Sequence, residues 1–287
     1  MTSSQEMTPA PPGQPYRGNG IDRPTVPLPP DYLSLFRAGQ LRKRWHYVSF
    51  WSRELSFCAA RVSVGPLRQE YWAIWDRAAQ EFRERSHLFK RYVLIEPNRL
   101  QVNDSDVAID LTYQSCSSFE VYRPARRAYI WSHKDYCRQA HGTVRYGSTT
   151  RAVTGVVFVD INTGYHERHT HWRWAAAAGT DQHGRLVAFN AITGLFDTPV
   201  NSERTTWIEE DAREIGPNTF SEDLLTVGFA EGGTLRFKRE ALLEHHDNFL
   251  VIRSDYFHWF GTYSGMLPGG IELREAFGVF ERHDALW

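Results

Sequence analysis

The chemical groups that stand out in this sequence are concentrated at residues 164–174, Gly-Tyr-His-Glu-Arg-His-Thr-His-Trp-Arg-Trp. A core strand does not need imidazole, guanidinium and carboxylate groups at this density, because charged side chains are seldom buried without a partner. Such a mixture is typical of a site that binds a ligand and moves protons. We therefore expect a functional site here, with His169 as a catalytic candidate. Four more residues of the stretch are ligand-binding candidates, namely Tyr165, His171, Trp172 and Trp174.

The same stretch favours a strand over a helix, since Thr, Tyr and Trp suit a pleated surface. Successive side chains of a strand point to opposite faces of its sheet. One face would then carry His169, His171 and Arg173, and the other Thr170, Trp172 and Trp174.

A second candidate site lies near the C-terminus, where Glu281 and His283 alternate with apolar residues. If residues 271–285 form one strand, all of its odd-numbered side chains share a face. An apolar setting raises the pKa of a carboxyl group toward the working range of a general acid, and a neighbouring imidazolium lowers it again. The alternative is an ion pair at the rim, between Glu281 and Arg282 or Arg168.

Glu203 is a third candidate, because it shares a predicted strand face with Trp207. An acid beside an indole can move a proton while the ring stabilises a developing cation. The alternative is an ion pair of an edge strand, between Glu203 and Arg204 or Arg213.

A predicted strand over residues 248–260 is largely apolar on both faces, which is typical of a central strand. Arg253 and Asp255 would share one of these faces with Trp259, and buried charges either pair or serve a ligand. A bend at residues 261–265 would present Tyr263. These four side chains are therefore expected to bind substrate.

Three imidazoles, His166, His169 and His171, have a spacing that can supply zinc ligands. However, no HExxH pattern accompanies them, and on a strand His166 need not point with the other two. The sequence also lacks GxGxxG after a strand, a P-loop and a GxSxG elbow. We therefore expect neither a metal nor an organic cofactor.

These candidates must be positioned by strands, because short runs of strand-forming residues alternate with turn residues along most of the chain. That spacing predicts an all-β protein whose antiparallel sheets curl into barrels. Residues Asp181–Gly184, Glu231–Gly233 and Pro268–Gly270 predict hairpin turns. Only a few short helices are expected, at residues 32–38 and 78–85.

A candidate boundary at residues 147–150 divides the chain into two barrel-like units, 31–150 and 151–287, which share an interface. The second unit would carry most of the site residues. Residues 1–30 are rich in proline and have little to bury, so we expect them to be disordered or to lie over the surface.

The composition excludes several classes of protein. The 33 Lys and Arg residues nearly balance the 34 Asp and Glu residues, so nothing indicates nucleic acid or an anionic membrane surface as a partner. No segment approaches the roughly 20 apolar residues of a membrane span. The three widely spaced cysteines suit a reducing cytoplasm. The ten Trp residues suit the walls of a pocket, which need large apolar groups with a polar handle.

Four motifs in chain order resemble signatures of the bacterial domain-of-unknown-function family 2804. They are Gly164-Tyr-His-x-Arg-His-Thr-x-Trp-x-Trp174, Ser202-Glu-Arg-Thr-x-Trp207, Phe260-Gly-Thr-x-Ser-Gly265 and Gly278-Val-x-Glu-x-His-Asp-Ala-x-Trp287. The resemblance implies a β-rich fold near the lipocalin-like two-barrel proteins, which include carotenoid hydratases, tocopherol cyclase and some natural-product cyclases. The chain departs from the family pattern at His258-Trp259, where smaller or polar residues are common.

The residues and the resemblance together predict a cofactor-independent enzyme. It would hold an apolar small molecule, such as a polyene, a polycyclic natural product or a lipid, and catalyse its hydration, isomerisation or cyclisation. Glu203 and Glu281 are the acid and base candidates, with His169 and His283 as their partners. The walls that would stabilise a cation are Trp172, Trp207 and Tyr263. Two alternatives stay open, a non-catalytic lipid- or metabolite-binding protein and a metal-dependent hydrolase.

Overall fold

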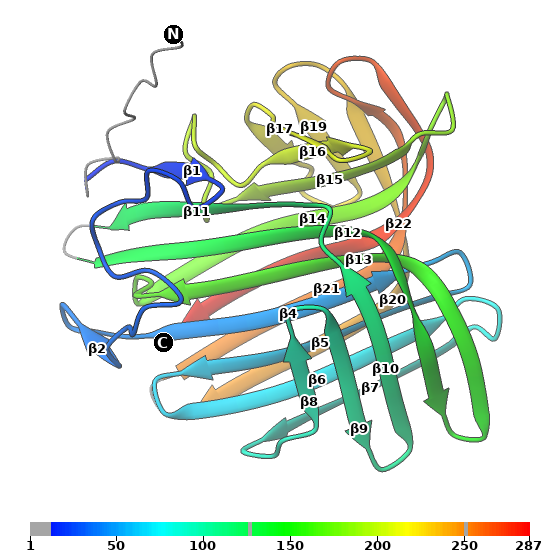
Figure 1. Cartoon of the computed structure of the whole chain (residues 1–287), viewed down its shortest axis with the longest axis horizontal. Helices are drawn as coiled ribbons and strands as arrows, with labels where there is room; N and C mark the ends of the chain where they lie inside the picture. Colours follow the sequence, from blue (N-terminus) through cyan, green and yellow to red (C-terminus); the bar gives the residue numbers. More distant parts are fainter. Residues whose placement is uncertain (1–12, 126–127, 250–251) are drawn as a thin grey trace, which may run out of the picture.

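The computed structural model describes residues 13–125, 128–249 and 252–287, and their regular structure is antiparallel strand (Figure 1). These ranges contain no helix, and therefore no helix that is long and apolar enough to cross a membrane.

The helix predicted at residues 32–38 is wrong. The segment is irregular except for β2 (Phe36–Arg37), which pairs with β3 (Gln40–Leu41). Ala38 and Gly39 both have positive φ angles, 51° and 83°. Two successive left-handed residues form the tight turn of a hairpin, which a helix cannot contain.

The helical turn predicted at residues 78–85 is also wrong, because the segment holds a turn and the start of β7 (Glu81–Leu88). Asp76 accepts a hydrogen bond of 3.0 Å from the backbone N–H of Ala79, and Gln80 has a φ of 54°. The chain therefore reverses, and β7 pairs with the strand before it.

The first sheet has 11 strands in the described chain, in the order β7-β6-β5-β4-β13-β12-β10-β9-β8 with β11 on β12 and β1 on β11. Besides β7, these strands are β1 (Tyr16–Gly18), β4 (Lys43–Trp51), β5 (Leu55–Val64), β6 (Leu67–Asp76), β8 (Val93–Glu96), β9 (Arg99–Asp104), β10 (Val107–Gln114), β11 (Ser117–Ala125), β12 (Ala128–Tyr146) and β13 (Thr149–Gly164).

The second sheet has 9 strands in the described chain, in the order β17-β16-β15-β14-β22-β21-β20-β19-β18. The predicted turns at residues 181–184, 231–233 and 268–270 are confirmed, because each connects two paired strands of this sheet. The strands are β14 (His169–Asp181), β15 (Leu186–Thr193), β16 (Thr205–Ile208), β17 (Asp211–Glu214), β18 (Asn218–Phe220), β19 (Thr226–Phe229), β20 (Thr234–Phe249), β21 (Ile252–Leu267) and β22 (Ile271–Leu286).

Apolar side chains form a layer that the two sheets share. Tyr47 and Phe158 enter this layer from the first sheet, and Trp174 and Phe260 enter it from the second. Each sheet also curls over a core of its own, so that Val48, the neighbour of Tyr47, packs on the opposite face of β4. The predicted fold class, two curled antiparallel sheets packed together, is confirmed.

β22 departs from the alternation predicted for residues 271–285. A register shift, which marks a β-bulge, lies between Leu273 and Glu275 against β14 and between Leu273 and Ala276 against β21. Leu273 therefore packs into the second sheet's own core, whereas Phe277 faces the shared layer and Glu275 is exposed. The prediction of one continuous face was wrong across the bulge, although Phe277 and Glu281 do share a face beyond it.

Residues 1–30 were predicted to be disordered or to lie over the surface; residues 13–30 are ordered and lie against the first sheet, and residues 1–12 lie outside the described chain. β1 pairs with β11, and Leu28 is buried with Leu33 and Tyr165 in a small apolar cluster. The segment thus covers apolar surface that the first sheet would otherwise expose.

The domain division proposed at residue 150 stays a prediction. Residue 150 lies at the start of β13, directly after the turn from β12. Both strands belong to the first sheet, and the chain passes to the second sheet between Gly164 and His169.

The close contact between β14 and β22 predicts that one added methyl group destabilises the folded protein. A Cβ at Gly278 would overlap the carbonyl oxygen of Ala176 and the Cβ of Ala177. We expect Gly278→Ala to lower the free energy of unfolding by about 1–3 kcal/mol, measured by urea unfolding. Gly13→Ala is the control, because no atom lies within 4 Å of its added Cβ. Equal midpoints for the two variants would contradict the close packing of this strand pair.

Candidate active site

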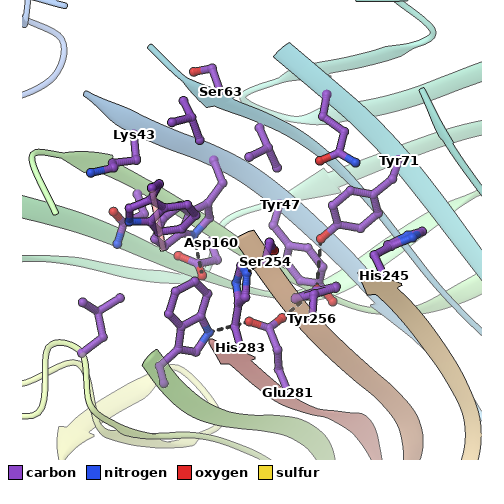
Figure 2. Close-up of a pocket in the computed structure, with 18 of the residues that line it drawn as sticks. Lys43, Tyr47, Ser63, Tyr71, Asp160, His245, Ser254, Tyr256, Glu281 and His283 are labelled. Atoms are coloured by element: carbon purple, nitrogen blue, oxygen red, sulfur yellow. Dashed lines mark hydrogen bonds between the residues drawn. The ribbon is translucent and has the colours of Figure 1, made fainter. Parts of the chain in front are cut away.

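A cavity of about 160 Å³ lies between the two sheets, in their shared layer (Figure 2). The first sheet contributes residues of β4, β5, β6, β7, β12 and β13, and the second contributes residues of β14, β15, β20, β21 and β22. An apolar cavity of about 150 Å³ binds benzene, so this one has room for a compact apolar ligand. Its aromatic walls are Trp45, Tyr47, Tyr71, Trp172, Trp174, Phe196, Tyr256 and Trp287.

Glu281 is a buried carboxylate on the cavity wall, and its two oxygens accept hydrogen bonds from the side chains around it. Trp172 donates to its Oε1 (2.6 Å), Tyr256 donates to its Oε2 (2.8 Å), and His258 Nδ1 lies 3.2 Å from the same oxygen. Burial raises the pKa of Glu281, but the bonds from His258 and Trp172 outweigh it and leave the pKa below its ordinary value. Glu281 is therefore ionised at neutral pH.

Three tyrosines extend this network. The hydroxyl of Tyr256 lies 3.1 Å from that of Tyr71 (Figure 2). The hydroxyl of Tyr47 lies 3.4 Å from His258 Nε2. Burial raises the pKa of all three phenols well above the ordinary value, so they keep their protons. The network can therefore pass a proton between Glu281 and a ligand that touches Tyr71 or Tyr256.

A second charged group of the cavity consists of Lys134, Asp160 and Glu203, all buried. Lys134 Nζ lies 2.8 Å from Asp160 Oδ1 and 3.2 Å from Glu203 Oε1. Lys134 and Asp160 are direct partners in the register of β12 and β13, whereas Glu203 belongs to the second half of the chain. Burial lowers the pKa of Lys134, but the two carboxylates outweigh it and leave the pKa raised. The lysine is therefore a cation.

The pKa of Glu203 is shifted in the opposite direction to that of Glu281. Burial raises its pKa, Lys134 opposes that rise, and the charge of Asp160 adds to it, which brings the pKa to about 7. Two carboxylates share one cation here, so one of them holds a proton near neutral pH. Glu203 is thus a candidate general acid.

The loop before β16 is fixed on both sides of Glu203. Asn190 donates to the backbone carbonyl of Glu203 (2.7 Å) and accepts a hydrogen bond from the indole of Trp174 (2.6 Å). Arg17, from β1, donates to the carbonyl of Ser202 (2.5 Å). The N-terminal segment therefore helps to set the position of this carboxyl group.

Five residues named from the sequence line the cavity: Glu203, Glu281, His283, Trp172 and Trp174. His283 Nε2 lies 2.7 Å from Ser254 Oγ, and its ring centroid is 4.3 Å from that of Trp172. Burial lowers the pKa of His283 to about 4, so the imidazole is neutral at pH 7.

His169 and His171 do not join these residues. Both are exposed on the outer face of β14, where His169 pairs with Asp284 at 3.0 Å. The alternation predicted for this strand is confirmed, but the face that carries Trp172 is the inner one. We therefore withdraw His169 as a catalytic candidate and His171 as a binding candidate.

The odd-numbered face of β21 points away from the cavity. Arg253 is exposed, Asp255 lies 2.8 Å from His246 at the surface, and Trp259 packs under Arg239. Arg253, Asp255 and Trp259, which we predicted to bind substrate, therefore lie outside the cavity.

Three further binding candidates are buried elsewhere. Tyr165 lies in the N-terminal apolar cluster, and Tyr263 lies in the second sheet's own core, where it donates to the carbonyl of Val279. Trp207 lies in the shared layer against Phe119, outside the cavity lining.

His166 does not converge with His169 and His171. Its ring is buried and lies 3.0 Å from the side-chain oxygen of Asn162. Within residues 13–125, 128–249 and 252–287, no group of three His, Cys, Asp or Glu side chains is arranged to hold a metal ion.

Sequence reasoning missed Lys134, Asp160, Tyr256 and His258. Of the first two, only Asp160 carried a usable signal, because it is a single charge within the apolar run Val156–Ile161. Tyr256 and His258 alternate with Arg253 and Asp255 on a strand that is apolar on both faces, so periodicity does not identify the inner face.

A model of the family described as "Domain of unknown function (DUF2804)" matches residues 90–287, which is more than half of the chain. No curated protein matches the chain. A solved structure of a candidate AttH protein from Nitrosomonas europaea is 12% identical, with a TM-score of 0.53 over 90% of this chain and 98% of that one. That likeness shows the fold alone.

Two other solved structures are more weakly similar. Kievitone hydratase from Nectria haematococca is 10% identical, with a TM-score of 0.49. CghA is 8% identical, with a TM-score of 0.39. Each match covers 85% of this chain and 88% of the other. TM-scores below 0.5 carry no argument about this chain.

The raised pKa of Glu203 predicts a pH-dependent stability. A carboxyl whose pKa is raised by folding stabilises the protein when protonated, and this contribution is lost as pH rises from the ordinary value of 4.5 to about 7. We expect Glu203→Gln to remove that loss, so the variant gains stability relative to the wild type between pH 5 and pH 8. Urea unfolding across this range measures the difference. Glu222→Gln, at an exposed glutamate, is the control, and parallel profiles for wild type and Glu203→Gln would contradict the assignment.

Proposed function

The chain belongs to the DUF2804 family, as its four motifs predicted, and we propose that it is a cofactor-independent enzyme. It binds an apolar small molecule between its sheets and catalyses hydration, isomerisation or cyclisation by proton transfer. One observation carries this proposal: two buried carboxyls line the same aromatic cavity, and their pKa values are shifted in opposite directions. Such a pair is how one site supplies both an acid and a base at neutral pH.

Glu203 is the proposed acid. Near pH 7 it holds a proton that it can give to a double bond or a leaving hydroxyl of the ligand. Lys134 would then stabilise the ionised carboxylate, whereas the charge of Asp160 favours its return to the protonated form. The positive charge that develops on the ligand would face indole rings, of which Trp45 and Trp172 stack with centroids 5.6 Å apart.

Glu281 is the proposed base. Its negative charge would attract the cationic intermediate, and it would take a proton from a neighbouring carbon, directly or through Tyr256. In an isomerisation the ligand gains one proton from Glu203 and loses one to Glu281. Exchange with solvent then restores both groups, so atoms and charge balance without a co-reactant.

A non-catalytic carrier of an apolar metabolite is the second candidate. It is favoured by the hydrogen bonds of Glu281, because a carboxylate held by three protein donors can also be purely structural.

We also propose a cytoplasmic location. Cys58 and Cys137 are buried free thiols, and burial raises the pKa of both, so neither is activated for oxidation. Thiols of this kind suit a reducing compartment.

Native mass spectrometry of the protein from its own host identifies a bound compound, and turnover of that compound in D₂O then tests catalysis. We expect the wild type to place deuterium on carbon. Glu203→Gln should retain the compound but lose deuterium incorporation by about 10²–10⁴-fold, the usual contribution of a general acid. Glu222→Gln should match the wild type. Retention of the compound without any deuterium incorporation by the wild type would favour the carrier.

The pH dependence of kcat/KM gives a separate prediction. The proposed reaction needs Glu203 protonated and Glu281 ionised, so the rate should fall as pH rises through about 7. Glu281 is protonated only at pH values below the ordinary pKa of a glutamate. The fall of the rate at acidic pH is therefore well separated from the fall near pH 7. A rate that rises through pH 7 would exclude Glu203 as the acid.

A further inference from the structure

Six large apolar side chains are exposed at the end of the molecule where the cavity opens. We call them the mouth patch: Leu35, Phe36, Leu41, Leu67, Leu88 and Phe89. The most exposed are Phe89 at 66% and Phe36 at 59%. Single exposed apolar residues are ordinary, but a contiguous group marks an interaction site.

The mouth patch is contiguous because three segments meet there. The β2–β3 hairpin contacts the turn between β5 and β6, since Gly65 N–H donates to the carbonyl of Arg42 (2.9 Å). The end of β7 lies beside the start of β6, since Phe89 N–H donates to the carbonyl of Arg68 (3.0 Å). Figure 1 shows β2 near the ends of β5 and β6.

Phe89 has a backbone conformation that bulky residues seldom adopt, with a φ of 61°. Residues held in such conformations cluster at functional sites. Holding Phe89 in this backbone conformation therefore costs conformational free energy.

The same three segments are strongly basic, although the whole chain has a net charge of −1. Residues 31–44, 61–68 and 88–91 contain one acidic residue, Asp31. The cations there that are exposed or partly exposed are Arg37, Arg42, Arg44, Arg61, Arg68, Lys90 and Arg91. On the opposite wall of the cavity mouth, the second sheet contributes Asp247. The near balance of charge in the sequence thus hides a local excess of positive charge around the mouth patch.

We propose that the mouth patch docks on a bilayer that contains anionic lipids. The cations would lie at the headgroups, and the phenylalanine and leucine side chains would enter the acyl boundary. A second copy of the chain is a poor occupant, because a two-fold contact would bring the two basic clusters together.

The cavity is continuous with this surface. Leu67 and Leu88 belong to the mouth patch and also line the cavity, together with Arg68. An apolar ligand dissolved in the bilayer would therefore reach the aromatic walls without crossing water. The inference goes beyond the proposed reaction, because docking holds whether the cavity catalyses or only carries.

Vesicle flotation tests this inference. We expect the protein to float with vesicles of equal parts phosphatidylcholine and phosphatidylglycerol, and to be released by high salt. Vesicles of phosphatidylcholine alone should bind it weakly. Phe36→Ser with Phe89→Asn should abolish the flotation, and Asn tolerates the positive φ at position 89.

The charges are tested by Arg44→Gln, Lys90→Gln and Arg91→Gln, none of which lines the central cavity. Each should weaken binding to the anionic vesicles by roughly fivefold. Matched controls are Val200→Ser for an exposed apolar residue and Arg213→Gln for an exposed cation elsewhere. Thermal unfolding should be unchanged in all variants, since these side chains are exposed or partly exposed.

Three outcomes would overturn the inference. The first is equal binding of patch and control variants to anionic vesicles, and the second is no binding by the wild type. The third is a dimer in analytical ultracentrifugation that Phe36→Ser with Phe89→Asn dissociates, because the mouth patch would then be an interface between copies.

Discussion

The contact between the two sheets depends on the ion pairs of the Lys134 ammonium group. A buried cation without partners costs several kcal/mol, and breaking a buried pair leaves that cost uncompensated. Asp160 compensates from the neighbouring strand of the same sheet, but Glu203 and the ring of Trp174 come from the second half of the chain. The charge is therefore fully compensated only when the sheets are packed together. The same requirement places a carboxyl group with a raised pKa on the cavity wall.

The N-terminal segment belongs to this arrangement. Arg17 lies 3.7 Å from the centroid of the Phe119 ring in the first sheet, and it donates to Ser202 and Thr205 on either side of Glu203. Burial lowers the pKa of Arg17 to about 10, so the guanidinium is still charged at neutral pH. A segment that its composition predicts to be disordered or to lie over the surface thus connects the first sheet to the loop of the proposed acid.

Periodicity predicted the strands better than it predicted the site, for a physical reason. On β14 the alternation correctly places Trp172 and His171 on different faces. Which of the two faces is buried depends on the side chains of the first sheet that pack against it. On β21 both faces are apolar, because one faces the shared layer and the other is partly covered, so Tyr256 and Asp255 cannot be told apart by pattern. The bulge before Glu275 adds one residue that no local signal marks. By contrast, Glu203 and Glu281 were predictable, since an acid within an aromatic stretch has to be paired or used.

The opposite behaviour of the two carboxyls follows from the number and charge of their partners. Hydrogen bonds to a charged group contribute about 1.5–3 kcal/mol each. Glu281 receives bonds from Trp172 and Tyr256, with His258 within reach, and so its burial is offset without a neighbouring anion. Glu203 shares its one cation with Asp160, so burial is only partly offset. A ligand between them meets a proton donor on one side and a fixed negative charge on the other. The cavity is therefore polarised before a ligand enters, and in the proposed reaction that polarity would set which end of the ligand is protonated.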